Sequence, residues 1–255
     1  MEDIYKTIVE VLQKGERASL ATVIARKGST PACIGFKMLV LSNGEILGTV
    51  GGGCIESEIR NIAIEVMESR ISRLFSFELN DENSICGGSM EVFIEPIITS
   101  EKLYIFGAGH IGQALSKIAA MTGFNVIIID DREEYANRER FPEAHNIIVS
   151  DFGDSFQQLE IDDNSFIVIV TRGHTYDELV LGLACQTKAK YIGMIGSKKK
   201  IQSVFNNLRQ KGISNEKLSE IHAPIGLDIG SETPSEIAVS ILAEMIQFRH
   251  SSESK

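Results

Sequence analysis

The chain has 255 residues, of which 43% are hydrophobic and 24% charged, a composition typical of a globular protein with a packed core. This length favours two modest domains or one large one, and we expect two. Because 35 acidic residues outnumber 25 basic ones, the net charge of −10 would repel a phosphate backbone, and we expect no nucleic-acid partner. A small anionic ligand then requires a local positive site, built from backbone N–H groups or a helix start.

The N-terminal segment lacks the basic start and unbroken apolar run of a signal peptide. Apolar runs such as Phe166–Val170 are far shorter than the roughly 18 residues that cross a bilayer. We therefore expect a soluble, cytoplasmic protein without a membrane partner. The four cysteines, Cys33, Cys54, Cys86 and Cys185, have no CxxC spacing, and we interpret them as reduced thiols.

Residues 1–100 predict a small α+β domain, rich in glycine turns. The spacing Ile4, Ile8, Val11 predicts an opening helix, and Asn43-Gly44 predicts a hairpin because both residues tolerate a positive φ. The predicted elements are a helix ending at Gly15, strands over 19–25, 38–41 and 45–50, a helix over 56–69, and strands over 73–79 and 90–97.

From residue 101 onward, short apolar runs alternate with helical segments, which is typical of a parallel sheet. We therefore predict an α/β protein, with a Rossmann-like doubly wound parallel sheet over residues 101–255 preceded by the smaller α+β domain. The predicted strands cover 103–106, 125–129, 146–149, 166–170 and 191–195, and the predicted helices cover 110–121, 176–187 and 198–211, with a last one opening at the capping box Thr233-Pro234-Ser235-Glu236.

A G-x-G-x-x-G pattern at residues 107–112 follows the first of these strands and opens a helix. Gly107 permits the tight turn, Gly109 lets a pyrophosphate approach the backbone, and Gly112 allows close helix–strand packing. Asp130 ends the next strand, where an acceptor for a ribose hydroxyl belongs. The motif predicts a nucleotide-like phosphate ligand, and the alternative is a tight turn that binds nothing.

In a doubly wound sheet the first, fourth and fifth strands are neighbours, so the segments that leave their carboxyl ends line one crevice. Imidazole, guanidinium, hydroxyl and ammonium groups there would hold an anion. Alternatively, His174 caps a helix and the lysines 198–200 form a solvated helix start, which is the favoured interpretation for the lysines. The candidate cofactor-binding residues of these segments are His110, Thr171, Arg172, His174, Gly196 and Ser197, beside Gly107, Gly109, Gly112 and Asp130.

Cys54 stands between the glycines 51–53 and a helix start, where N–H groups and the helix dipole lower the pKa of a thiol. Cys86 precedes two glycines and a strand in a similar way. Two such thiols suggest sulfur or soft-metal chemistry, whereas small buried cysteines beside turns are the alternative. Cys54 and Cys86 are thus candidate catalytic residues, Cys54 is a candidate metal ligand, and Gly51, Gly52, Gly53 and Glu56 are candidate cofactor-binding residues. We interpret Cys33 and Cys185 as structural.

These motifs together resemble the XdhC/CoxI family of accessory proteins for molybdenum hydroxylases, through nearly the whole chain. The family often has arginine after the proline at position 31, where this chain has Ala32-Cys33. The matching segments are Gly28-Ser29-Thr30-Pro31, residues 48–56, Cys86-Gly87-Gly88 with Glu95-Pro96, residues 107–112, Ile195-Gly196-Ser197-Lys198, residues 224–230 and residues 233–238.

The resemblance implies a chaperone, rather than a catalyst, that binds molybdenum cofactor (molybdopterin). It would protect the cofactor while a cysteine desulfurase supports exchange of an oxo ligand for sulfido, and then deliver it to an apo-hydroxylase of the xanthine dehydrogenase type. We also expect a homodimer. The loop at residues 107–112 could hold the pterin phosphate or a separate nucleotide such as NAD, and the sequence does not decide between them.

Three other functions compete with this interpretation. An NAD-dependent oxidoreductase would use the second domain for its cofactor and the first for its substrate, but it would leave the thiol motifs without a role. A nucleotide-dependent phosphotransferase would use the anion crevice, although the GK[ST] of a Walker motif is missing. A catalytic subunit of the hydroxylase is disfavoured, because the chain is short and its four cysteines lack ferredoxin spacing.

Overall fold

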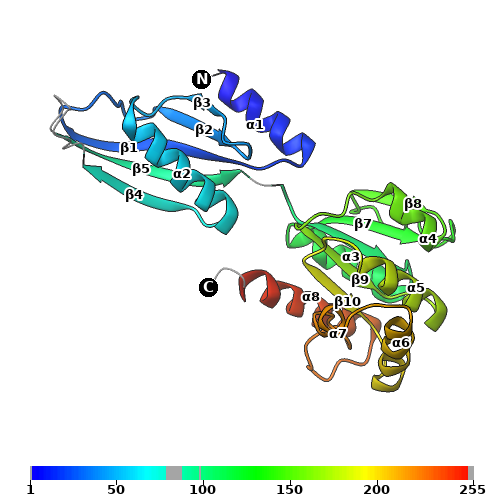
Figure 1. Ribbon diagram of the computed structural model, residues 1–255. Coiled ribbons are helices and arrows are strands. Elements are labelled where there is room, and N and C mark those ends of the chain that lie inside the picture. The colour runs from blue at the N-terminus through cyan, green and yellow to red at the C-terminus, as the bar shows by residue number, and fades with distance from the viewer. Residues whose placement is uncertain (1, 79–87, 98, 252–255) are drawn as a thin grey trace. The chain divides into compact units, whose positions relative to one another are not determined.

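The computed structural model describes residues 2–78, 88–97 and 99–251, and of Cys54 it describes the backbone alone. The chain forms two compact units, Met1–Thr99 and Ser100–Lys255 (Figure 1).

The N-terminal unit is built on a five-stranded antiparallel sheet with the order β3-β2-β1-β5-β4. The predicted hairpin between β2 and β3 is confirmed, since Gly44 has φ 82° and the Leu41 amide donates to the Glu45 carbonyl. The elements are α1 (Glu2–Lys14), β1 (Ala18–Gly28), β2 (Lys37–Leu41), β3 (Ile46–Gly48), α2 (Cys54–Ser69), β4 (Arg73–Glu78) and β5 (Gly88–Ile97).

Alternating side chains of this sheet enter two different clusters, because successive residues of a strand face opposite sides. On one face, Ile59 and Ala63 of α2 pack against strand residues such as Val23. On the other face, Ile4 of α1 packs against Leu20. Both helices therefore bury an apolar stripe against the same sheet.

The C-terminal unit is a five-stranded parallel sheet with the order β10-β9-β6-β7-β8. Its first strand, β6, lies between β7 and β9, and β9 pairs with β10, so the predicted adjacency of the first, fourth and fifth strands is confirmed. The elements are β6 (Lys102–Phe106), α3 (His110–Met121), β7 (Asn125–Asp130), β8 (Asn146–Val149), α4 (Phe152–Ser155), a 3-10 turn (Phe156–Gln158), β9 (Ser165–Ile169), α5 (His174–Ala184), β10 (Tyr191–Met194), α6 (Lys198–Gln210), α7 (Asn215–Ser219) and α8 (Pro234–Ser251).

Helices cover both faces of this sheet, and this gives the predicted α/β fold with a Rossmann-like C-terminal unit. Ile105 of β6 packs in one cluster with Leu115 of α3 and Ile241 of α8. Phe106, the next residue, packs in the opposite cluster with Leu181 of α5. Because both faces are buried, the strands other than the edge strand β8 are largely apolar rather than alternating, as the sequence indicated.

Some boundaries differ from the sequence predictions. Helix α5 begins at His174, two residues earlier than expected, because Gly173 occupies the N-cap position in an extended conformation. The short helices α4 and α7 were not predicted, since a single turn carries no detectable periodicity. They are stabilised by side-chain caps: Asp151 accepts from the Gly153 amide, and Ser214 accepts from the Lys217 amide.

The predicted capping box of α8 is confirmed. The Glu236 amide donates to the Thr233 hydroxyl at 3.3 Å, and the Thr233 amide donates to the Glu236 carboxylate at 2.8 Å. These reciprocal bonds satisfy two backbone donors that the helix itself leaves free.

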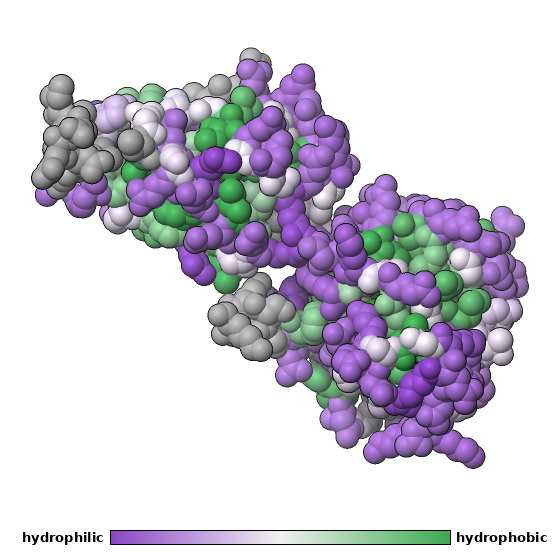
Figure 2. Space-filling view, in the orientation of Figure 1, coloured by the Kyte–Doolittle hydropathy of each residue, from purple (hydrophilic) through white to green (hydrophobic). Residues whose placement is uncertain are grey.

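Hydrophilic residues predominate on the face of the molecule drawn in Figure 2, and hydrophobic residues show in smaller areas. Among the described helices, none combines the length and the apolar composition that a membrane crossing requires.

The turn from β6 into α3 depends on glycine at two of its three motif positions. A Cβ on Gly112 would lie 2.1 Å from the Gly107 carbonyl oxygen, and a Cβ on Gly107, at φ 118°, would lie 2.4 Å from the Val170 carbonyl oxygen. A Cβ on Gly109 would meet nothing within 4 Å. Gly107 and Gly112 are thus required by packing, whereas Gly109 leaves space above the loop.

We therefore expect Gly112→Ala to lower the free energy of unfolding by about 1–3 kcal/mol, because α3 must move away from the Gly107 carbonyl, directly after β6, to relieve the overlap. Gly109→Ala is the matched control, since its methyl group enters open space, and its effect should stay within about 0.5 kcal/mol. Chemical denaturation of both variants measures the difference. Equal stabilities would contradict this close approach of α3 to β6.

Candidate functional site

The loop before α2 contains three consecutive glycines with positive φ, 134° at Gly51, 83° at Gly52 and 73° at Gly53. Residues with a Cβ rarely adopt this conformation, so the loop needs glycine at these three positions to keep its shape. Cys54 follows as the first residue of α2. Its side chain lies outside the described part of the chain.

Glu56, in the first turn of α2, fixes the same loop. Its Oε1 accepts hydrogen bonds from the Val50 amide at 3.3 Å, from the Gly52 amide at 3.0 Å and from the Thr49 hydroxyl. Charge-assisted bonds of this kind are stronger than neutral ones and hold the loop in one conformation. Glu56 is a candidate cofactor-binding residue from the sequence. In the structure, its Oε1 accepts hydrogen bonds from the loop itself.

Two further motif segments meet this region at one end of the N-terminal sheet. A Cβ on Gly51 would lie 3.3 Å from the Ala32 amide nitrogen, so the glycine loop contacts the loop after β1. A Cβ on Gly88 would lie 2.6 Å from the Ser29 carbonyl oxygen, so the start of β5 contacts the same loop. The backbone that precedes Cys54 and the backbone that follows Cys86 thus both approach residues 29–32. Cys86 and Gly87 fall within residues 79–87, outside the described residues.

The other two cysteines differ in exposure. Cys185 is buried, and burial raises the pKa of its thiol. Cys33 is exposed, on the loop that contacts the glycine turn. Sequence reasoning set Cys33 aside as structural, although its place directly after the Gly-Ser-Thr-Pro segment could have indicated a position near the site.

In the C-terminal unit, the glycine-rich loop borders a cavity of about 240 Å³ at the carboxyl ends of the strands. The N-cap of α3 is Gly109, which provides no side-chain acceptor for the first amides of this helix, and Gly109, His110 and Ile111 all line the cavity. The lining residues are Gly107, Gly109, His110, Ile111, Arg132, Val170, Thr171, Arg172 and Pro234.

Asp130, at the end of β7, is buried with 1% of its surface exposed. Its Oδ2 accepts from the Ala108 amide at 2.8 Å and from Nη2 of Arg132 at 3.0 Å. Its Oδ1 accepts from the Arg132 amide at 3.1 Å and from Arg132 Nε at 2.9 Å. Burial opposes ionisation, but the hydrogen bonds from Arg132 and Ala108 outweigh it and keep the pKa of Asp130 below its usual value.

A second ion pair lies beside this one. Arg172 donates from Nη1 and Nη2 to the two carboxylate oxygens of Asp131, at 2.6 and 2.7 Å, and from Nη2 to the Tyr176 hydroxyl at 3.0 Å. These hydrogen bonds, with that to Asp131 the strongest, raise the pKa of Arg172. Sequence reasoning included Arg172 but missed Arg132 and Asp131, which directly follow Asp130.

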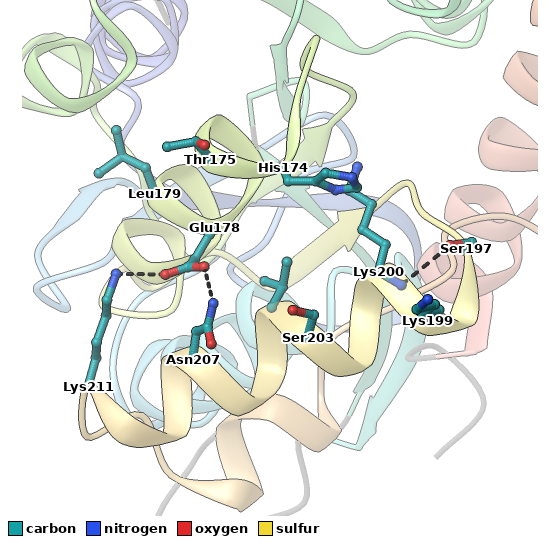
Figure 3. A pocket seen from close by; sticks show the side chains of 11 residues that line it. His174, Thr175, Glu178, Leu179, Ser197, Lys199, Lys200, Ser203, Asn207 and Lys211 are labelled. Atoms are coloured by element: carbon teal, nitrogen blue, oxygen red, sulfur yellow. Dashed lines mark hydrogen bonds and ion pairs between the residues drawn. The ribbon is translucent and has the colours of Figure 1, made fainter.

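Two other candidates, His174 and Ser197, line a different cavity, of about 740 Å³, between α5 and α6 (Figure 3). His174 and Ser197 lie at one end of it, while Glu178 at the other end accepts from Asn207 and Lys211, at 2.7 Å each. The expected single crevice is therefore divided: His110, Thr171 and Arg172 border the loop cavity, and His174 and Ser197 border this groove.

A buried carboxylate connects the two cavities. Asp177 has no exposed surface, accepts from the Thr171 hydroxyl at 2.6 Å and forms an ion pair with Lys200. Lys198 and Lys199 are exposed to solvent, as predicted for a solvated helix start. Lys200 is instead the partly buried partner of Asp177 in the ion pair. The N-cap of α6 is Ser197, whose side chain accepts from the Lys200 amide. The neighbouring candidate Gly196 packs against the Lys200 side chain.

No group of three or more His, Cys, Asp or Glu side chains that could hold a metal ion occurs among the described residues. Cys54 stays the metal-ligand candidate of the sequence, at a position where the structure gives its backbone alone.

Comparisons with known proteins match both units. A family model described as the XdhC Rossmann domain matches residues 103–245, and one described as the XdhC and CoxI family matches residues 11–78. The protein YqeB of Escherichia coli (strain K12), called uncharacterized, is 33% identical over 238 residues, which are 91% of this chain but 43% of that protein. The chain thus spans less than half of the length of that relative.

Two other relatives match along nearly their whole length. A Bacillus subtilis (strain 168) protein, named as a probable subunit of xanthine dehydrogenase, is 22% identical, covering 98% of both chains. The molybdenum cofactor insertion chaperone PaoD of Escherichia coli (strain K12) is 24% identical, covering 98% of this chain and 90% of that one.

A crystal structure described as a xanthine dehydrogenase from Bacillus halodurans shares the fold, with a TM-score of 0.56, 22% identity, and coverage of 96% of this chain and 95% of that one. The Rossmann-domain model alone covers more than half of the chain, and the second model covers most of the N-terminal sheet. On these matches, the chain belongs to the XdhC and CoxI family.

Proposed function

We propose that this protein is an accessory protein of a molybdenum hydroxylase, which binds molybdenum cofactor and inserts it into the apo-enzyme. The names of two relatives, one a molybdenum cofactor insertion chaperone and the other a probable xanthine dehydrogenase subunit, support this proposal. The cofactor is here the cargo of the protein rather than its resident group. Because the pterin itself carries the metal, the protein need not supply a complete set of metal ligands.

The observation that carries the proposal is the gathering of motif segments at one end of the N-terminal sheet. The loop after β1 contacts both the glycine turn that leads to Cys54 and the strand start that follows Cys86. A thiolate suits a soft, sulfur-rich metal centre. In our proposal Cys54 supplies the sulfur ligand at the start of α2, with Cys86 as a second thiol, and Glu56 holds the loop in shape through the Gly52 amide.

The C-terminal unit would hold the negatively charged part of the cargo. Its glycine-rich loop leaves open space above Gly109 and presents the start of α3, where a phosphate is stabilised by N–H groups and the helix dipole. The proposed partners are an apo-hydroxylase of the xanthine dehydrogenase type, a cysteine desulfurase that provides sulfur for the cofactor, and a second copy of this chain.

An anaerobic binding experiment tests the proposal against the NAD-dependent alternative. The purified protein is incubated with molybdenum cofactor and, in parallel, with NAD, and each mixture is separated by gel filtration. We expect the pterin and molybdenum to co-elute with the protein and NAD to elute separately. Co-elution of NAD without pterin would replace the chaperone function with that of an oxidoreductase.

Cys54→Ser should reduce loading of a partner apo-hydroxylase by at least about tenfold, because the oxygen that replaces the thiolate is a poor ligand for a soft metal. Cys185→Ala is the matched control, since Cys185 is buried in a hydrophobic cluster of the C-terminal unit. Loading is measured as hydroxylase activity after mixing, and circular dichroism checks the fold. If Cys54→Ser loads as well as the control, Cys54 has no part in transfer.

A further inference from the structure

We propose that the cavity at the glycine-rich loop binds one isolated phosphate group, as in a phosphomonoester, and excludes dinucleotides such as NAD. This inference deepens the proposed function, on which it rests in treating the loop as the phosphate site. Four observations carry it: the occupied carboxylate of Asp130, the ion pair between Asp131 and Arg172, the size of the cavity, and the donors that line it.

The first observation concerns the acid that would hold a ribose. In dinucleotide-binding folds, an acidic residue at the end of the second strand accepts hydrogen bonds from the ribose hydroxyl. Asp130 has this position, but its two oxygens already accept four hydrogen bonds from Ala108 and Arg132. A carboxylate offers about four acceptor positions. With 1% of its surface exposed, Asp130 has neither a free acceptor nor access to a ribose.

The second observation concerns the strand ends. Strand β6, which leads into the glycine loop, lies between β7 and β9. Asp131 follows β7 and Arg172 lies on the segment after β9, so their ion pair connects the two strands that flank β6. A dinucleotide crosses the carboxyl ends of these strands, with its two nucleosides on opposite sides of the first strand. The ion pair therefore occupies the crossing path and leaves a shorter site.

The third observation is the size of the site. The cavity has a volume of about 240 Å³, below the roughly 300–1,000 Å³ of pockets that hold drug-sized ligands. A phosphate group with a short ester arm fits such a space, whereas a dinucleotide would need the ion pair to open.

The fourth observation is the set of groups that remain for a phosphate. Arg132 and Arg172 both line the cavity, and a guanidinium has more N–H donors than their carboxylate pairing uses. The amides at the start of α3 add further donors, and nothing within 4 Å of the Gly109 Cβ position would obstruct an anion. Asp130 and Asp131 keep both guanidiniums in place before the ligand arrives.

Calorimetric titration of the whole protein tests this inference, with phenyl phosphate and inorganic phosphate as isolated phosphates and NAD and NADP as dinucleotides. We expect either isolated phosphate to bind at least about tenfold more tightly than NAD or NADP. Gly109→Asp should abolish phosphate binding, because its carboxylate would enter the space above the loop, and Gly109→Ala should retain more of it. Dinucleotides that bind as tightly as phenyl phosphate, or the absence of any phosphate binding, would overturn the inference.

A second variant tests whether the ion pair between Asp131 and Arg172 keeps NAD out of the site. Asp131→Asn removes the closer carboxylate partner of Arg172, at 2.6 Å, and leaves Asp130 at 3.9 Å, so Arg172 is held less firmly across the strand ends. NAD affinity should then rise by about tenfold while phenyl phosphate binds at least as well as before. Asp154→Asn makes the same change of charge at an exposed site in α4 and should leave NAD affinity unchanged. Equal NAD affinities in the two variants would contradict the exclusion of NAD by this ion pair. Since the titrations contain neither molybdenum cofactor nor hydroxylase, their failure would leave the loading experiment as a separate test of the proposed function.

Discussion

The buried carboxylate of Asp130 is the interaction on which the ligand-binding edge of the C-terminal sheet depends. Leaving a charge in this position without partners would be very costly, and the Ala108 amide and Arg132 supply the hydrogen bonds that offset this cost. One of these bonds ties the glycine loop after β6 to the end of β7. The shape of the loop is therefore fixed by a side chain of the neighbouring strand as well as by its own glycines.

The N-terminal unit uses a related device. There a carboxylate from the first turn of a helix, Glu56, accepts amides from the loop that precedes the helix. The three glycines 51–53 allow the loop to adopt positive φ, and Glu56 selects one conformation from those that the glycines permit. In both units an acidic side chain thus fixes a flexible glycine turn at the start of a helix, so the turn is ordered before a ligand arrives.

These two turns have different chemical capacities. The turn at 51–53 leads to a cysteine at the first position of a helix. The turn at 107–112 presents amides and borders two guanidiniums, which suit a phosphate. In the function that we propose, the metal of the cofactor would suit the first turn and its phosphate the second, whereas an NAD-dependent oxidoreductase would leave the thiol motifs without a role.

Local patterns along the chain were sufficient to predict the α/β fold and the glycine turns, because apolar periodicity and turn chemistry are local properties. The adjacency of the first, fourth and fifth strands followed from the topology of a doubly wound sheet. They also indicated the family, since the motifs at 28–31, 48–56 and 107–112 are contiguous segments. The hydrogen-bond and ion-pair partners of the buried polar groups are visible only in the folded chain. The partners of Asp130 and Asp177, and the division of the expected crevice into two cavities, depend on contacts between residues from different elements, whose distances no local pattern encodes.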